Sequence, residues 1–194
     1  MVSKDIIITE YIGREGIKEI ADLEKDKISE RFSGTFVMRP EGKLKRDADR
    51  RSPEEKAAAI CGTLKRFGVP AENQFFSGIG NGGVFKTLWD MSEELKTGFK
   101  VDLLSIPIKQ ETVEICELLQ INPYCLKSGK EVCLITADNG NMICDELSKE
   151  DINSIVIGYT VPGKSKILVN NDRIRYLDRP VSDEVFRYKE EYKC

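Results

Sequence analysis

The chain has 194 residues, of which 40% are hydrophobic and 32% charged, a composition typical of one ordinary globular domain. Its 30 basic and 33 acidic residues leave a net charge of -3, which provides no positive field to attract nucleic acid. No run approaches the ~20 apolar residues needed to cross a bilayer, and residues 1–5 do not begin a signal peptide. We therefore expect a cytoplasmic protein that contacts neither nucleic acid nor membrane.

The absence of histidine excludes Ser-His and Cys-His catalytic pairs built from this chain alone. None of the cysteines forms a C-x-x-C pair of the kind that zinc sites use, so we expect no metal site and reduced thiols. No catalytic residue is predicted either. The six cysteines are Cys61, Cys116, Cys125, Cys133, Cys144 and Cys194.

The first predicted element is a buried strand over 5–11, rich in β-branched residues. Gly13 and Gly16 follow and predict a turn. Apolar residues at helical spacing between 17 and 28 then predict one helix, with charged residues on its other side, and we expect this helix to cover the sheet.

Mixed charges crowd the next stretch and predict a flexible loop over 33–52, with an anion-binding lid as the alternative. Ser52 and Glu55 form a capping box, and Pro53 suits the first helical position, so a helix starts here. Gly68 supplies the left-handed residue that often ends a helix.

The remaining chain alternates helices and strands. We predict a buried helix on Val84, Leu88, Met91 and Leu95, a strand over 99–103, a helix from Val113 toward Asn122, a strand over 132–136, a helix over 141–147 and a strand over 154–160. Turns then separate strands over 166–169 and 173–177, which predicts an antiparallel meander. The fold class is α+β, a layered mixed β-sheet with packed helices in a single domain over 1–194, with a tail over 181–194.

The most informative stretch is Ser77-Gly78-Ile79-Gly80-Asn81-Gly82-Gly83, directly before the helix that carries Trp89. Glycines let the backbone approach a ligand, and N–H groups at a helix start favour phosphate. No clear strand precedes the loop and no Gly-Lys-Ser/Thr follows it, so a structural tight turn stays as the alternative. The candidate ligand-binding residues for a phosphorylated small molecule are Gly78, Gly80, Asn81, Gly82 and Gly83.

Several motifs follow from this loop onward, namely Gly82-Gly83-Val84, Leu88-Trp89-Asp90-Met91, Ile106-Pro107-Ile108, Glu111-Thr112-Val113-Glu114-Ile115-Cys116 and Ile121-Asn122-Pro123-Tyr124. Together they resemble the C-terminal domain of proteins related to aminoimidazole ribonucleotide (AIR) synthetase, nearest to the hydrogenase maturation (E-type) branch. The resemblance covers nearly all of the chain and is weakest over 33–73. It implies the AIR synthetase C-terminal-domain fold.

The sequence departs from that family at three places. Ser77-Gly78 and Gly80-Asn81 stand where relatives have His-Asp and Thr-Glu, so no acid–base group is implied there. Lys127-Ser128-Gly129-Lys130 stands where relatives have Ile-Ser-Ser-Gly, which adds Ser128 and Gly129 to the candidate ligand-binding residues. Relatives end in Pro-Arg-Ile-Cys, whose cysteine carries a carbamoyl group, and here only the terminal Cys194 matches.

The resemblance leaves three functional hypotheses open. In the family, a preceding N-terminal domain holds ATP and magnesium, and this sequence has no counterpart of it. The leading hypothesis is a stand-alone, non-catalytic domain that needs no cofactor and binds a phosphorylated small molecule, a nucleotide or a protein partner. The second is one half of a split enzyme, with ATP and Mg supplied by an ATP-binding partner in trans. The third makes Cys194 a carbamoyl-type carrier that works with hydrogenase maturation proteins.

Overall fold

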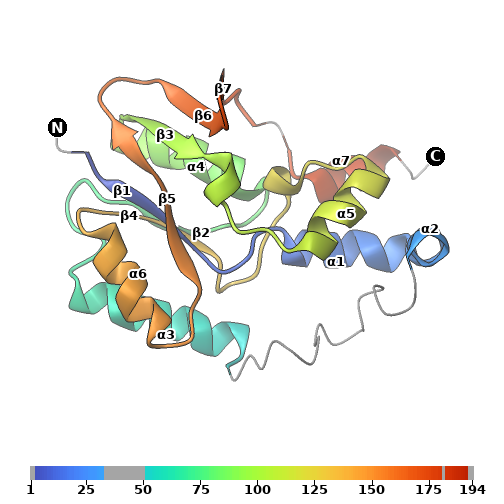
Figure 1. Cartoon of the computed structure of the whole chain (residues 1–194), viewed down its shortest axis with the longest axis horizontal. Helices are drawn as coiled ribbons and strands as arrows, with labels where there is room; N and C mark the ends of the chain where they lie inside the picture. Colours follow the sequence, from blue (N-terminus) through green and yellow to red (C-terminus); the bar gives the residue numbers. More distant parts are fainter. Residues whose placement is uncertain (1–2, 33–50, 181, 192–194) are drawn as a thin grey trace.

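The computed structural model of the chain describes residues 3–32, 51–180 and 182–191 (Figure 1). The flexible loop predicted over 33–52 therefore lies outside the described residues, except for Arg51 and Ser52, and so does Cys194. The centre of the fold is a seven-stranded sheet in the order β2-β4-β1-β5-β3-β6-β7. The strands are β1 (Asp5–Thr9), β2 (Phe76–Gly78), β3 (Gly98–Asp102), β4 (Cys133–Ala137), β5 (Ser154–Val161), β6 (Lys166–Asn170) and β7 (Arg173–Tyr176).

The sheet is mixed, as predicted, because β3 and β6 run parallel while the other neighbouring strands are antiparallel. The antiparallel meander predicted for the C-terminal part is correct for β6 and β7 but wrong for β5 and β6. Strand β3 lies between β5 and β6, so the turn at 162–165 passes over its end instead of closing a hairpin. Gly98 permits this crossing, since a Cβ on it would lie 2.5 Å from the carbonyl oxygen of Ser165. Only β6 and β7 form the expected hairpin.

Helices surround the sheet in the α+β arrangement that the sequence predicted. They are α1 (Arg14–Leu23), α2 (Lys25–Arg31), α3 (Pro53–Arg66), α4 (Gly83–Leu95), α5 (Gln110–Leu119), α6 (Gly140–Ser148) and α7 (Glu184–Glu191), with short 3-10 turns η1 (Leu103–Ser105) and η2 (Pro123–Cys125). The capping box of α3 is confirmed: the Ser52 hydroxyl accepts from the Glu55 N–H, and the Glu55 carboxylate accepts from the Ser52 N–H.

Two apolar clusters pack on opposite faces of the sheet. Alternating residues of β1 explain the division, because Ile6 and Ile8 point toward α4 while Ile7 points toward α3 and α6. Figure 1 shows α3 and α6 together along one side of the sheet. The cluster beneath these two helices contains residues of β1, β4 and β5, but among the described residues it does not extend to β3, β6 or β7.

The helices α1, α2, α5 and α7 form a third cluster, gathered at one end of the sheet (Figure 1). Ile17 and Ile20 of α1 pack here against other helices, so the prediction that this helix covers the sheet is wrong. Gly16 lies inside α1, and the turn is made by Gly13 alone. The predicted tail contains α7, which buries Val185 and Tyr188 against the other helices of this cluster.

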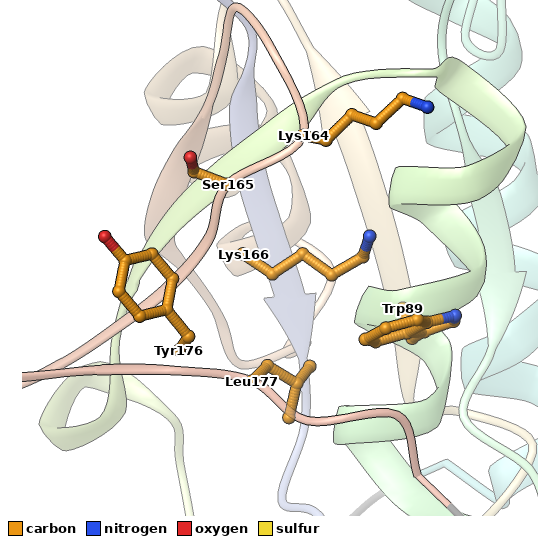
Figure 2. Close-up of a pocket in the computed structure, with 6 residues that line it drawn as sticks. All are labelled: Trp89, Lys164, Ser165, Lys166, Tyr176 and Leu177. Carbon is orange, nitrogen blue, oxygen red and sulfur yellow. The ribbon is translucent and has the colours of Figure 1, made fainter.

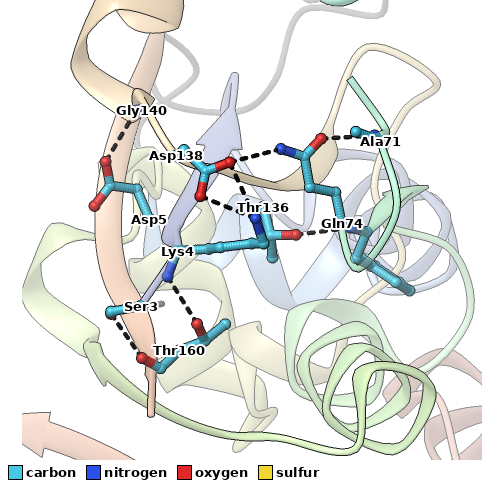
Figure 3. Close-up of polar contacts among 10 residues, drawn as sticks. Ser3, Lys4, Asp5, Ala71, Gln74, Thr136, Asp138, Gly140 and Thr160 are labelled. Carbon is cyan, nitrogen blue, oxygen red and sulfur yellow. Dashed lines mark hydrogen bonds and ion pairs between the residues drawn. The ribbon is translucent and has the colours of Figure 1, made fainter. Parts of the chain in front are cut away.

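Polar contacts fix the start of β1 in the middle of the sheet (Figure 3). Lys4 donates its ammonium to Asp138 at 2.9 Å and its N–H to the Thr160 hydroxyl at 2.9 Å. Gln74 also donates to Asp138, at 3.3 Å, and Asp5 accepts from the N–H of Gly140, the first residue of α6, at 2.9 Å. These contacts join the strand to both of its neighbours and occupy the Asp138 carboxylate.

Candidate functional site

The glycine loop lies between β2 and α4. A strand does precede the loop, contrary to the sequence analysis, although β2 has three residues at the edge of the sheet. Ile79 donates its N–H to Val132 at 2.9 Å and accepts from the N–H of Ser128 at 3.0 Å. The structure therefore brings the loop and the Ser128 segment side by side.

The paired glycines are required by packing. Gly82 and Gly83 have φ angles of 85° and 65°, in the left-handed region that favours glycine. A Cβ on Gly83 would lie 2.4 Å from the carbonyl oxygen of Tyr124, so the start of α4 lies directly against the backbone of η2. Phe85 of α4 also stacks on the ring of Tyr124, with centroids 4.9 Å apart. The structural role proposed as the alternative thus accounts for this pair.

The N-terminus of α4 already has an anion, which the chain supplies itself. Gly82 donates its N–H to Oδ2 of Asp183 at 2.7 Å, and Asp183 is only 2% exposed. The other oxygen, Oδ1, accepts from the N–H of Val185 at 2.9 Å and caps the start of α7. One carboxylate therefore serves two helix starts, and it takes the N–H that the sequence analysis expected to face a phosphate.

The seven expected ligand-binding residues divide into two groups. Gly78, Gly80 and Asn81 are exposed, and a Cβ on Gly80 would meet no atom within 4 Å. The other four, Gly82, Gly83, Ser128 and Gly129, are engaged in packing or hydrogen bonds. For example, the buried Ser128 hydroxyl accepts from the N–H of Gly13 at 2.9 Å. Phosphate binding by this loop stays a prediction, and it rests on the exposed group.

Gly129 packs under the side chain of Glu131. A Cβ on Gly129 would lie 2.3 Å from Oε2 of Glu131. This carboxylate oxygen is buried, and none of the described residues forms a hydrogen bond with it. Gly129 therefore provides the space for a buried glutamate, and its own role is structural.

The described cysteines are spread over α3, α5, η2, β4 and α6. Burial raises the pKa of Cys116 and Cys133 to about 12 and that of Cys125 to about 11, with the charge of Glu184 adding to the effect at Cys116 and Cys125. These three thiols stay protonated at neutral pH and are poor nucleophiles. Within the described ranges, no cluster of Cys, Asp or Glu side chains is arranged to hold a metal ion.

A groove of about 400 Å³ lies between α4 and the start of β6 (Figure 2). The ammonium of Lys166 lies 4.2 Å from the centroid of the Trp89 ring and 2.8 Å from Oε1 of Glu93. The residues that line the groove are Trp89, Lys164, Ser165, Lys166, Tyr176 and Leu177. This groove was not predicted from the sequence, because Trp89 lies beside the apolar stripe of a predicted buried helix and Lys166 begins a predicted strand.

The fold can be compared with known proteins. No family model and no curated protein matches the chain. Among solved structures, HypE of E. coli, a hydrogenase maturation protein, matches 97% of this chain and 53% of its own chain, with a TM-score of 0.69 and 15% identity. PurL of T. maritima, solved with ATP, gives a TM-score of 0.57 and 13% identity over 95% of this chain and 25% of its own.

AaThiL, solved with AMPPCP and TMP, also matches, with a TM-score of 0.54 and 16% identity over 95% of this chain and 52% of its own. The fold is that of the AIR synthetase-related proteins. The resemblance drawn from the motifs is confirmed at this level. The chain spans about half the length of HypE, and none of the helices in the described ranges is long and apolar enough to cross a membrane.

Proposed function

We propose that this chain is a protein-binding module that pairs with an ATP-binding partner and has no catalytic activity by itself. The observation that carries the proposal is the extent of the structural match: almost all of this chain aligns with about half of the HypE chain. HypE has been solved in complex with ATP, and so has PurL. In the proposed pair, the partner takes the place of the half of HypE that this chain does not match.

A surface suited to such a partner lies on the sheet. Residues directly opposite one another on neighbouring strands point to the same face. Tyr159 pairs with Lys100, Lys100 with Ile167, and Ile167 with Tyr176, so these four residues form a row across β5, β3, β6 and β7. Asp5 places the row on the α3 and α6 side, since it pairs with Tyr159 and shares a face with Ile7 of β1.

The cluster under α3 and α6 stops short of this row, and apolar side chains are exposed there. Tyr159 is 43% exposed, Tyr176 67% and Ile174 64%. We call Tyr159, Lys100, Ile167, Tyr176 and Ile174 the uncovered half-sheet. Exposed apolar patches of this kind favour protein–protein contact, because a partner that covers them removes apolar surface from water.

The test is capture of a partner by the tagged chain from its native cell extract, followed by reconstitution of ATP hydrolysis from the two purified proteins. We expect no hydrolysis by the chain alone and hydrolysis by the pair. Ile174→Glu should abolish capture, because it places a charge in the uncovered half-sheet. Met142→Glu is the matched control, since Met142 on α6 is similarly exposed, at 57%.

Two results would refute the proposal. One is ATP hydrolysis by the homogeneous chain without a partner. The other is equal loss of capture with Ile174→Glu and Met142→Glu while both variants keep the unfolding temperature of the parent. Capture of a protein that does not bind ATP would support the stand-alone, partner-binding hypothesis instead. The carrier role of Cys194 stays a prediction, because that residue lies outside the described ranges.

A further inference from the structure

The groove beside Trp89 has a positively charged wall. In Figure 2 the side chains of Lys164 and Lys166 both extend toward α4, and Leu177 lies next to Trp89 below them. The Lys166 side chain is 9% exposed, so its ammonium is held in place by packing, by the Trp89 ring and by Glu93. A side chain fixed in this way loses little further freedom when it binds a ligand.

Several cationic side chains act on a single carboxylate, that of Glu93. The hydrogen bond from Lys166 lowers the pKa of Glu93, and the charges of Lys164 and Arg179 lower it further. Three positive groups therefore act on Glu93, and two of them, Lys164 and Lys166, line the groove. A phosphate monoester carries about -1.5 to -2 charges at neutral pH, so these lysines would attract it.

We propose that this groove binds the phosphate group of a small phosphorylated molecule, with Lys164 and Lys166 as its ligands and with Trp89 and Leu177 as the apolar wall. Lysine binds phosphate as a compact point charge with three donors, and Glu93 leaves donors of Lys166 available. The volume of about 400 Å³ falls within the range of roughly 300–1,000 Å³ found for small-molecule sites. The site is separate from the glycine loop, and it shares Tyr176 with the uncovered half-sheet.

The groove contains its own reporter, because Trp89 is the single tryptophan of the chain. Its fluorescence can be followed at constant ionic strength while inorganic phosphate, ribose 5-phosphate or AMP is added, with adenosine as the uncharged comparison. We expect saturable changes with the phosphorylated compounds and none with adenosine. Equal affinity for all three would assign the site to the phosphate group alone, and tighter binding of AMP would assign it to a nucleotide.

Lys164→Gln removes one cation from the exposed side of the groove and should weaken phosphate binding about tenfold. Lys65→Gln is the matched control, since Lys65 is an exposed lysine on α3, and it should leave the affinity unchanged. The proposal is wrong if adenosine binds as tightly as AMP, if Lys164→Gln keeps the parent affinity, or if no phosphorylated compound gives a saturable change up to about 1 mM.

Discussion

The ammonium of Lys56 lies 3.0 Å from Oε1 of Glu10, and both side chains are only 5% exposed. The same oxygen accepts from the N–H of Asn153 at 3.1 Å, and Glu10 donates its own N–H to the carbonyl of Asn153 at 2.8 Å. Glu10 takes a left-handed φ of 53° directly after β1. This pair therefore joins α3, the end of β1 and the approach to β5 at one buried point.

Lys56→Met should lower the free energy of unfolding by about 3–5 kcal/mol, because Glu10 would keep a buried charge without its cation. Urea unfolding measures the loss, and Lys65→Met on the exposed side of the same helix is the control. The double variant Glu10→Gln, Lys56→Met should recover part of the loss, since the introduced amide carries no charge and its oxygen can still accept from Asn153. A double variant as unstable as Lys56→Met would contradict this explanation.

Asp183→Ala should lower the free energy of unfolding by about 2–4 kcal/mol, because it removes the cap of α7 and leaves the buried N–H of Gly82 without its acceptor. Asp178→Ala, an exposed change nearby, should have little effect. Asp183→Asn should fall between the two, since the amide keeps one acceptor. Equal stability of the alanine variants at 178 and 183 in thermal unfolding would show that the shared carboxylate contributes nothing.

Gly83→Ala should lower the free energy of unfolding by about 2–4 kcal/mol, because alanine is strained at a positive φ and its Cβ would overlap the Tyr124 carbonyl. Gly80→Ala tests the opposite case three residues earlier, where a Cβ meets no atom within 4 Å. It should leave stability nearly unchanged. Chemical denaturation of both variants separates the packed part of the loop from its open part.

The free energy of unfolding should fall in alkaline solution, because the thiols of Cys116 and Cys133 are buried and keep their protons in the folded chain. The pKa of Cys116 and Cys133 is about 12 in the folded chain, against an ordinary value of 9.0, so the unfolded chain loses these protons first. The stabilisation is complete below pH 9 and is lost as pH rises toward 12, by up to ~1.4 kcal/mol per pH unit for each thiol. Unfolding free energies measured between about pH 8 and pH 10.5 should fall less steeply in the Cys116→Ala, Cys133→Ala double variant. Parallel curves would exclude these thiols as the cause.

Local features of the fold could be predicted because their causes are local. The capping box needs Ser52 and Glu55, three residues apart, and the start of α4 needs Gly82 and Gly83 next to it. Both are visible in any short window of sequence. The family motifs extended the prediction to the fold of the whole domain, and the solved structures confirm that fold.

The errors concern contacts between distant segments. The insertion of β3 between β5 and β6 is decided by packing across the sheet, and its only local trace is Gly98, where the crossing backbone leaves no room for a side chain. The contact between Gly82 and Asp183 spans 101 residues and has no local pattern. For the same reason the groove at Trp89 could not be predicted, because Lys166 reaches it from another element.

The position of β1 has a consequence for how the chain folds as it is made. This strand carries three consecutive isoleucines, Ile6 to Ile8, and it is bonded on both sides by β4 and β5, which end at Ala137 and Val161. A nascent polypeptide therefore exposes these isoleucines on the ribosome until β4 and β5 have been translated. Such late closure lengthens the time during which chaperones and proteases compete for the growing chain.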